Sequence, residues 1–114
     1  MTLRVLLADD DARFRDDVAQ VLAGTPRVQL VASAADADDA VRRYCELRPD
    51  VVLLGEAVEA APAILAVDPR ACILALTGRE PLRPVAGTRG VLKKDAVAIV
   101  PLLLQLAYRR MVSP

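Results

Sequence analysis

The stretch Pro49-Asp50-Val51-Val52-Leu53-Leu54-Gly55 is a short apolar run that ends in a residue without a side chain. A similar run, Leu3-Arg4-Val5-Leu6-Leu7-Ala8, opens the chain and leads into three aspartates at residues 9–11. Continuous apolar runs of this length are typical of strands that are buried on both faces of a parallel sheet. Further runs at 28–32 and 72–76, with a shorter one at 91–92, predict five strands.

Amphipathic segments separate these strands. After the first run, apolar side chains recur at the spacing of a helix that packs on a sheet: Phe14, Val18, Val21 and Leu22. Asp36 can cap a second helix, and the alanine-rich stretch 57–67 predicts a third. Residues 96–111 predict a last helix with Pro101 near its start. Strands that alternate with helices predict an α/β fold with a parallel sheet and right-handed crossovers.

One crossover has little room for a helix. Only residues 78–89 separate the fourth apolar run from Gly90, which opens the fifth. A parallel crossover needs roughly a dozen residues or more even when a helix is part of it. This one contains two glycines and two prolines, which are strong helix breakers. We therefore expect the helix between the fourth and fifth strands to be missing or reduced to a turn.

Composition narrows the possible functions. The 114 residues suffice for one domain, 1–114, with a real core. With fifteen basic and fifteen acidic residues, the chain has no excess of positive charge that would indicate nucleic-acid binding. The absence of histidine excludes histidine-based catalysis. Cys45 and Cys72 lie in apolar segments, which predicts buried free thiols. No apolar segment is long enough to span a membrane and the start is unlike a secretory signal, so we expect a cytoplasmic protein without a membrane partner.

Four motifs together resemble one family over nearly the whole chain. They are the acidic cluster after the first strand, Pro-Asp-Val-Val-Leu-Leu at 49–54, Ala-Leu-Thr-Gly at 75–78 and Gly-Val-Leu-Lys-Lys-Asp at 90–95. In this order they resemble the receiver domain of bacterial response regulators, closest to the NarL/LuxR-type subfamily. The resemblance implies a flavodoxin-like (CheY-like), doubly wound sheet of five parallel strands in the order 2-1-3-4-5. The carboxyl ends of such strands gather at one edge of the sheet.

The resemblance assigns a role to each strand-end residue. Asp9 and Asp10 match the acid pair that holds Mg²⁺ in receivers, a metal that takes oxygen ligands. Thr77 matches the hydroxyl that binds phosphoryl oxygens, and Lys94 matches the lysine that neutralises phosphoryl charge. Gly55 matches the aspartate that accepts the phosphoryl group and also ligates the metal. Glycine can do neither.

Val91 stands where the family usually carries a Tyr or Phe that swings inward on phosphorylation. Together with Gly55 and the missing helix, it indicates an atypical receiver, or pseudo-receiver, in which several parts of the phosphorylation relay have been lost together. We expect no catalytic residue and no cofactor, with residual Mg²⁺ at Asp9 and Asp10 as an open question. Restoring aspartate at position 55 should restore phosphorylation if the remaining pocket is intact.

Simpler interpretations of the same residues stay open. The acidic cluster can serve only as a solvated turn in which Asp11 caps the first helix. Lys94 can be a plain salt bridge to these acids, and Thr77 a strand-end hydroxyl. Glu56 is expected to point away from Gly55 if the strand continues, because side chains alternate along a strand.

The last helix is apolar nearly all round, whereas a helix on one side of a sheet needs a single apolar stripe. Contiguous exposed apolar patches usually mark a partner site. We expect a homodimer through the fifth strand and this helix, the region through which receivers commonly dimerise. The predicted interface consists of Val97, Val100, Leu103, Leu104, Ala107 and Tyr108. The alternative is that the helix is buried within its own domain.

Three functions remain open. The first is a phosphorylation-independent receiver that acts in signal transduction and transcription regulation through dimerisation, with a LuxR-type helix-turn-helix outside this chain to contact DNA. The second is a sensor that binds an apolar small molecule near Thr77, Leu82 and Val85. The third, a Mg²⁺-dependent phosphoryl-transfer enzyme, lacks a nucleophile where the family uses one. We therefore expect that the chain is not an enzyme.

Overall fold

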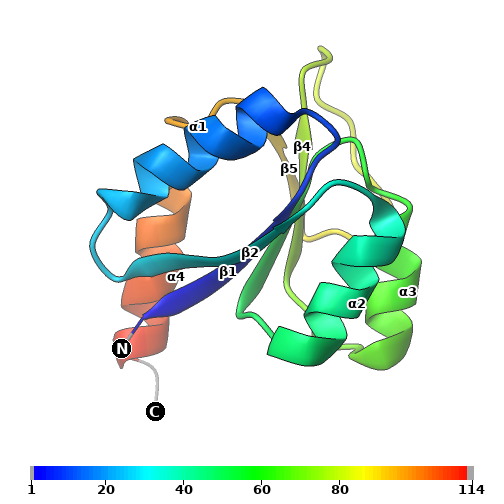
Figure 1. The fold of residues 1–114 in the computed structure, drawn as a ribbon, viewed down its shortest axis with the longest axis horizontal. Coiled ribbons are helices and arrows are strands. Elements are labelled where there is room, and N and C mark those ends of the chain that lie inside the picture. Colours follow the sequence, from blue (N-terminus) through cyan, green and yellow to red (C-terminus); the bar gives the residue numbers. More distant parts are fainter. Residues whose placement is uncertain (1, 113–114) are drawn as a thin grey trace.

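The computed structural model describes residues 2–112 and shows one parallel sheet with helices on both faces (Figure 1). The strands are β1 (Leu3–Ala8), β2 (Val28–Ala34), β3 (Val51–Leu54), β4 (Ile73–Thr77) and β5 (Gly90–Lys93). The helices within these residues are α1 (Ala12–Ala23), α2 (Ala37–Leu47), α3 (Ala60–Val67) and α4 (Val100–Val112). No helix in this part of the chain is both long and apolar enough to cross a membrane.

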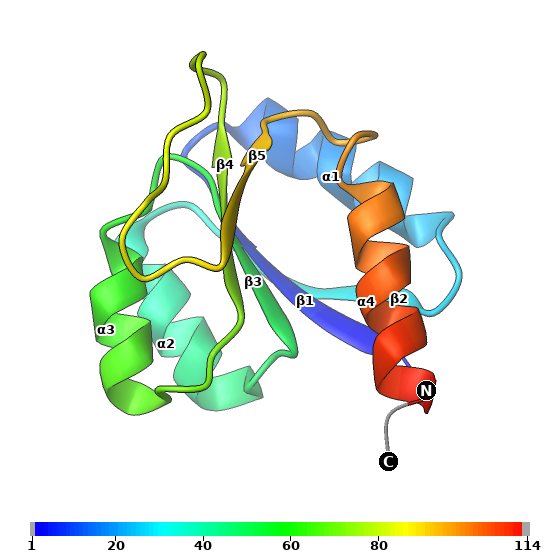
Figure 2. The same ribbon diagram turned by 180° about the vertical axis from the view of Figure 1, so that it is seen from behind.

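The strand order is β2-β1-β3-β4-β5, and every neighbouring pair is parallel. This confirms the flavodoxin-like topology that the sequence predicted. The apolar side chains of the central strands β1 and β3 are buried on both faces, as their continuous apolar runs require. Helices α1 and α4 cover one face and α2 and α3 the other, which Figures 1 and 2 show from opposite sides.

Aspartates begin the first two helices as predicted. The Asp11 carboxylate accepts hydrogen bonds from the backbone N–H groups of Arg13 (3.0 Å) and Phe14 (3.3 Å) at the start of α1. Asp36 accepts one from the N–H of Asp39 (2.8 Å) at the start of α2. These bonds satisfy N–H groups that have no partner inside a helix.

The connection between β4 and β5, which we call the β4–β5 loop (residues 78–89), contains no helix, as the sequence predicted. Figure 2 shows this loop in yellow beside α3. Gly87 has φ +82°, and a Cβ atom there would lie 3.0 Å from Leu65 Cδ1 of α3. Glycine therefore provides both the backbone conformation and the close approach to α3.

Two helices begin later than predicted, and both contain a proline. Helix α3 begins at Ala60 rather than at residue 57, and α4 begins at Val100 rather than at residue 96. A proline lacks the backbone N–H and its ring clashes with the carbonyl group four residues earlier, so it is tolerated only in a first helical turn. Pro62 and Pro101 each lie within the first three residues of the observed helix.

The prediction that both cysteines are buried was wrong for Cys45, which is exposed, while Cys72 is half-buried. Helix α2 places Ala40 and Tyr44 against the sheet. The residue after Tyr44 is turned about 100° farther around the helix, because an α-helix has 3.6 residues per turn. The side chain of Cys45 therefore reaches the surface.

Tyr44 links α2 to the segment that follows α3. Its side chain is buried, and its hydroxyl group donates a 2.8 Å hydrogen bond to the Asp68 carboxylate. Burial, followed by this hydrogen bond, raises the pKa of Tyr44 to about 12. The neutral phenol is thus the form that the folded state favours.

Replacing Tyr44 by phenylalanine is expected to cost about 0.5–1.5 kcal/mol at neutral pH, because a buried hydrogen bond is lost. In the wild type, the stabilisation linked to the raised pKa is complete below the ordinary tyrosine pKa of 10.0 and disappears as the pH rises to about 12. The variant should therefore lose less stability than the wild type over this interval, measured by urea unfolding. Tyr108→Phe, at an exposed tyrosine, is the control and should follow the wild type.

Candidate functional site: a carboxylate–lysine pocket at the strand ends

The predicted site residues lie at the same edge of the sheet. Asp9 follows β1, Gly55 follows β3, Thr77 ends β4 and Lys94 follows β5. Three of them meet closely, namely Asp9, Gly55 and Lys94. The side chain of Asp10 is exposed, and among residues 2–112 it forms no ion pair. The Thr77 hydroxyl accepts the backbone N–H of Arg79 (3.0 Å), which is the role of a strand-end hydroxyl.

Asp9 is the only charged residue among residues 2–112 that is fully buried. Its Oδ1 atom accepts hydrogen bonds from the backbone N–H of Asp11 (2.8 Å) and from Lys94 Nζ (3.1 Å). Lys94 Nζ also lies 2.9 Å from the second oxygen, Oδ2. A buried carboxylate requires such a partner, because an isolated ion in the protein interior is very costly. Asp9 and Lys94 therefore form one neutral, buried pair.

Gly55 is the residue that allows this pair to form. A Cβ atom built on Gly55 would lie 1.7 Å from Asp9 Oδ2, 2.6 Å from Asp9 Cγ and 3.0 Å from Asp9 Cβ. The Gly55 N–H donates a 2.7 Å hydrogen bond to the Ala8 carbonyl group, which holds its backbone against the end of β1. The side chain of Asp9 thus fills the space that any side chain at position 55 would need.

Two further residues contribute to the pocket around Lys94. Its Nζ lies 4.9 Å from the centroid of the Phe14 ring, within the range of a cation–π interaction. It also lies 4.0 Å from Glu56 Oε1. Only 16% of the Lys94 side chain is exposed. The ammonium group is therefore enclosed by an aromatic face and two carboxylates.

The sequence analysis did not predict that Phe14 and Glu56 contribute to the pocket around Lys94. Phe14 was assigned to the buried face of the first helix, although its being the only phenylalanine in the chain could have drawn attention to it. The prediction that Glu56 points away from Gly55 required the strand to continue, but β3 ends at Leu54 and the chain bends at residues 55 and 56. The alternation of side chains along a strand stops where the strand stops.

The residues present do not fit a Mg²⁺ ion. Magnesium demands nearly octahedral coordination by oxygen atoms, usually from one or two carboxylates together with several waters. Here both oxygens of Asp9 face the Lys94 ammonium group, and Gly55 offers no side-chain ligand. Within residues 2–112, no group of three or more His, Cys, Asp or Glu side chains is placed to hold a metal. Lys94 Nζ is the cation that Asp9 binds.

Helix α4 divides its apolar side chains between two sides. Leu103 and Ala107 are buried in the core against α1 and the sheet, as is Ile99 just before the helix, and Val100 packs against the same core. Leu103 and Ala107 were predicted interface residues, but their own domain already covers them. On the other side of the helix, Leu104 (36%) and Tyr108 (59%) are exposed, and so is Val97 (68%) in the preceding turn.

No family model matches the chain, but solved structures do. The receiver domain of the putative response regulator NarL from Mycobacterium tuberculosis is 25% identical with a TM-score of 0.79, over 94% of this chain and 97% of that one. A LuxR-family two-component response regulator from an Aurantimonas species is 27% identical with a TM-score of 0.79, over 95% and 86%. The response regulator domain of Thermotoga maritima CheB has a TM-score of 0.77 at 22% identity over both full chains.

Curated relatives match over shorter stretches. A protein-glutamate methylesterase/protein-glutamine glutaminase from Syntrophomonas wolfei is 42% identical over 52 residues, which is 46% of this chain and 15% of that protein. Its counterpart from Idiomarina loihiensis is 31% identical over 75 residues, or 60% of this chain and 19% of that protein. The chain thus spans less than a fifth of the length of these relatives.

Proposed function

We propose that this chain, which is a receiver domain of the response-regulator type, takes part in two-component signalling without being phosphorylated. The observation that carries the proposal is the position of the Asp9 side chain, whose Oδ2 lies 1.7 Å from where a Cβ at Gly55 would be. In receivers that the chain resembles, this position carries the phosphoryl acceptor. Here the space is filled, so the pocket has neither an acceptor nor room for one.

The electrostatics of the pocket support the same proposal. A phosphoryl group needs cationic partners, yet the Lys94 ammonium group is already paired with Asp9 at 2.9 Å. The remaining nearby acid, Glu56, adds negative charge on the open side of the pocket. A phosphoryl group bound there would meet the carboxylates of Asp9 and Glu56, and the ammonium group of Lys94 is already paired. This arrangement supports a binding or regulatory role and not a phosphoryl-transfer enzyme.

Treatment with a small-molecule phosphodonor and Mg²⁺ is the direct test, read by intact-protein mass and light scattering. We expect no phosphoryl adduct and no change in the oligomeric state. The Gly55→Asp variant should also stay unmodified, because Asp9 occupies the space of the new side chain. A phosphorylated Gly55→Asp variant as stable as the wild type would show that the pocket is still open, and would overturn the proposal.

The exposed face of α4 supports the second element of the proposal, which is a homodimer. Val97, Pro101, Leu104, Tyr108 and Met111, here called the α4 stripe, are all exposed. The four that lie in α4 recur at spacings of three and four residues, which places them on one side of the helix, and Val97 lies in the turn just before it. The stripe shares Val97, Leu104 and Tyr108 with the interface predicted from the sequence. The other predicted positions pack against the core and do not belong to the stripe.

The spacing of the stripe favours a second copy of this chain as its partner. The four stripe positions within α4 are symmetric about residue 106, so two antiparallel copies of α4 could pair around a two-fold axis near that residue. In that arrangement Leu104 would face Tyr108 of the partner subunit.

Replacing Leu104 by aspartate is expected to weaken the dimer at least about tenfold, because burying a leucine contributes about 1.5–3 kcal/mol and tenfold corresponds to 1.4 kcal/mol. Sedimentation equilibrium measures the dissociation constant. Gln105→Asp introduces the same charge at the next residue, which is exposed but outside the stripe, and should leave the dimer intact. A wild type that stays monomeric at high concentration would contradict the dimer.

A dimeric receiver can act on transcription by bringing two output domains together. The likeness to a LuxR-family response regulator supports a LuxR-type helix-turn-helix outside this chain as that output. The balanced charge of the chain, with 15 basic and 15 acidic residues, supports leaving DNA contact to such a domain. Dimers of helix-turn-helix proteins read two half-sites one helical turn apart. The α4 stripe would then set the geometry of DNA binding.

A further inference from the structure

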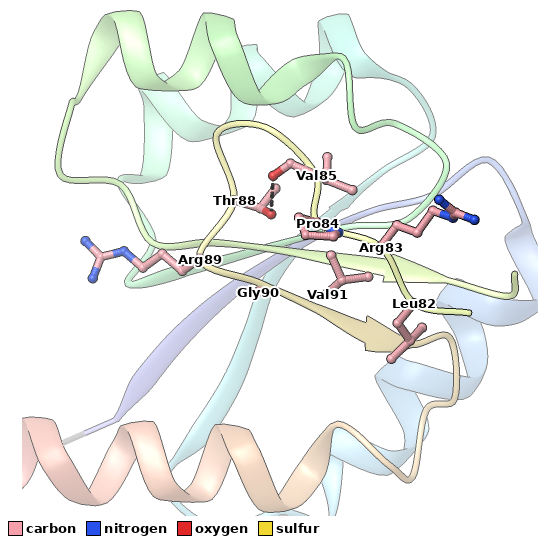
Figure 3. A pocket seen from close by; sticks show the side chains of 8 residues that line it. All are labelled: Leu82, Arg83, Pro84, Val85, Thr88, Arg89, Gly90 and Val91. Atoms are coloured by element: carbon pink, nitrogen blue, oxygen red, sulfur yellow. Dashed lines mark hydrogen bonds between the residues drawn. The ribbon is translucent and has the colours of Figure 1, made fainter. Parts of the chain in front are cut away.

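The β4–β5 loop leaves hollows on the surface where it crosses the sheet. Two cavities of about 370 and 340 Å³ lie along it. Both are lined by Arg83, Pro84, Val85 and Val91, and Figure 3 shows these side chains in the first cavity. Volumes of this size are typical of small-molecule sites. The hollows lie where the sequence predicted a ligand, since Thr77, Leu82 and Val85 are among their lining residues.

Apart from Arg83, the residues that the two cavities share are apolar. Val91 on β5 lies below Pro84 and Val85 of the loop in Figure 3. Leu82 at the rim is 47% exposed, although it is a large apolar side chain. The absence of a helix between β4 and β5 explains this exposure, because such a helix would cover these side chains. An apolar body could bury this surface and gain from leaving water.

The edges of the cavities are basic. Residues 77–93 contain four basic residues and one acidic residue, a net charge of +3 in a chain whose total is zero: Arg79, Arg83, Arg89, Lys93 and Glu80. Among residues 2–112, neither Arg79 nor Arg83 forms an ion pair. Arg89 donates a long hydrogen bond (3.3 Å) to the Arg70 carbonyl group. Two arginines are thus available to an anion.

Arginine suits an anionic ligand for a geometric reason. The planar guanidinium group can donate two parallel hydrogen bonds to a carboxylate, sulfonate or phosphate group. Arg83 lines both cavities and Arg79 lines the second. Thr77, Arg79 and Val85 also line a further hollow of about 240 Å³ that reaches Gly55 and Glu56. A bound anion would therefore lie beside the carboxylate–lysine pocket.

We propose that the β4–β5 loop is a binding site for a small organic anion, whose apolar body contacts Val85 and Val91 and whose charged group is bound by Arg79 and Arg83. The two cavities favour a small molecule over a nucleic acid or an acidic protein, which would need a broader surface. The charge excess in this segment favours an anion over a neutral ligand. The site requires neither phosphorylation nor the α4 stripe.

Anilinonaphthalene sulfonate, which has an apolar body and one sulfonate group, is a suitable fluorescent probe. Phenylnaphthylamine has nearly the same body without the charge and serves as its matched comparison. Titrations should use the Leu104→Asp protein, so that the α4 stripe does not offer a second apolar surface. We expect the sulfonate to bind at least about tenfold more tightly than the neutral compound, as a charge-assisted hydrogen bond implies.

Variants of the chain decide whether this preference arises at the loop. Arg83→Gln should weaken binding of the sulfonate about tenfold and leave the neutral compound unaffected. Arg13→Gln, at an exposed arginine of α1, is the matched control and should change neither affinity. Val91→Asp should weaken both compounds, with folding checked by circular dichroism. Binding that Arg83→Gln and Val91→Asp leave unchanged would overturn the proposal, as would tighter displacement of the probe by a short DNA or an acidic peptide.

Discussion

Replacing Lys94 by methionine is expected to lower the free energy of unfolding by about 3–5 kcal/mol, because it leaves Asp9 as a buried charge without a partner. Methionine keeps much of the length and volume of lysine, so the effect reports the lost charge and not a cavity. Only the backbone N–H of Asp11 would still donate to the carboxylate. Chemical denaturation of wild type and variant measures the difference.

Lys93→Met is the matched control, because Lys93 is the preceding residue and is exposed. It should change the free energy of unfolding by less than about 0.5 kcal/mol. The double variant Asp9→Asn with Lys94→Met should recover much of the stability, since it removes the unpaired charge as well. If Lys94→Met is no less stable than Lys93→Met, then the buried pair described here does not form in solution.

Replacing Gly55 by alanine is expected to cost about 1–3 kcal/mol or more, the usual effect of forcing extra atoms into a filled space. The added Cβ would lie 1.7 Å from Asp9 Oδ2, so the carboxylate must leave its position and with it Lys94. Gly78→Ala is the control, because a Cβ at Gly78 meets no atom within 4 Å. That variant should be about as stable as the wild type.

A double-mutant cycle identifies the atoms responsible. In an Asp9→Ala background, the oxygen and the Cγ nearest to the new Cβ are gone, so Gly55→Ala should cost much less than in the wild type. Equal costs in the two backgrounds would show that the loss comes from the backbone at position 55 and not from contact with Asp9. The cycle is completed by measuring the free energies of unfolding of the four proteins in urea.

The sheet could be predicted from the sequence because its signals are long and redundant. The runs ending at Ala8 and Leu54 are apolar except for Arg4, a pattern typical of strands that are buried on both faces. The missing helix between β4 and β5 was predictable from its glycines and prolines. Helix starts were less accurate, because Pro62 and Pro101 shift the first turn, and the local sequence does not show how the preceding residues fold.

The members of the site were predictable, but their arrangement was not. The resemblance brought Asp9, Gly55 and Lys94 to one edge of the sheet, yet it described an emptied pocket. The structure shows instead that the Asp9 side chain occupies the space. Which way a buried side chain turns depends on contacts between distant segments, here residues 9 and 94. The same limit applies to α4, where the sequence could not separate the buried Leu103 from the exposed Leu104.

The close approach of the Asp9 side chain to Gly55 also affects how the chain can evolve. A single-base change converts some glycine codons into aspartate codons, so mutation readily offers an aspartate at position 55. The protein that results would have two carboxylates competing for one space and one lysine. An aspartate there would therefore need at least one compensating substitution first. Glycine at position 55 is thus difficult to replace in a single step, because the protein after that step would be less stable.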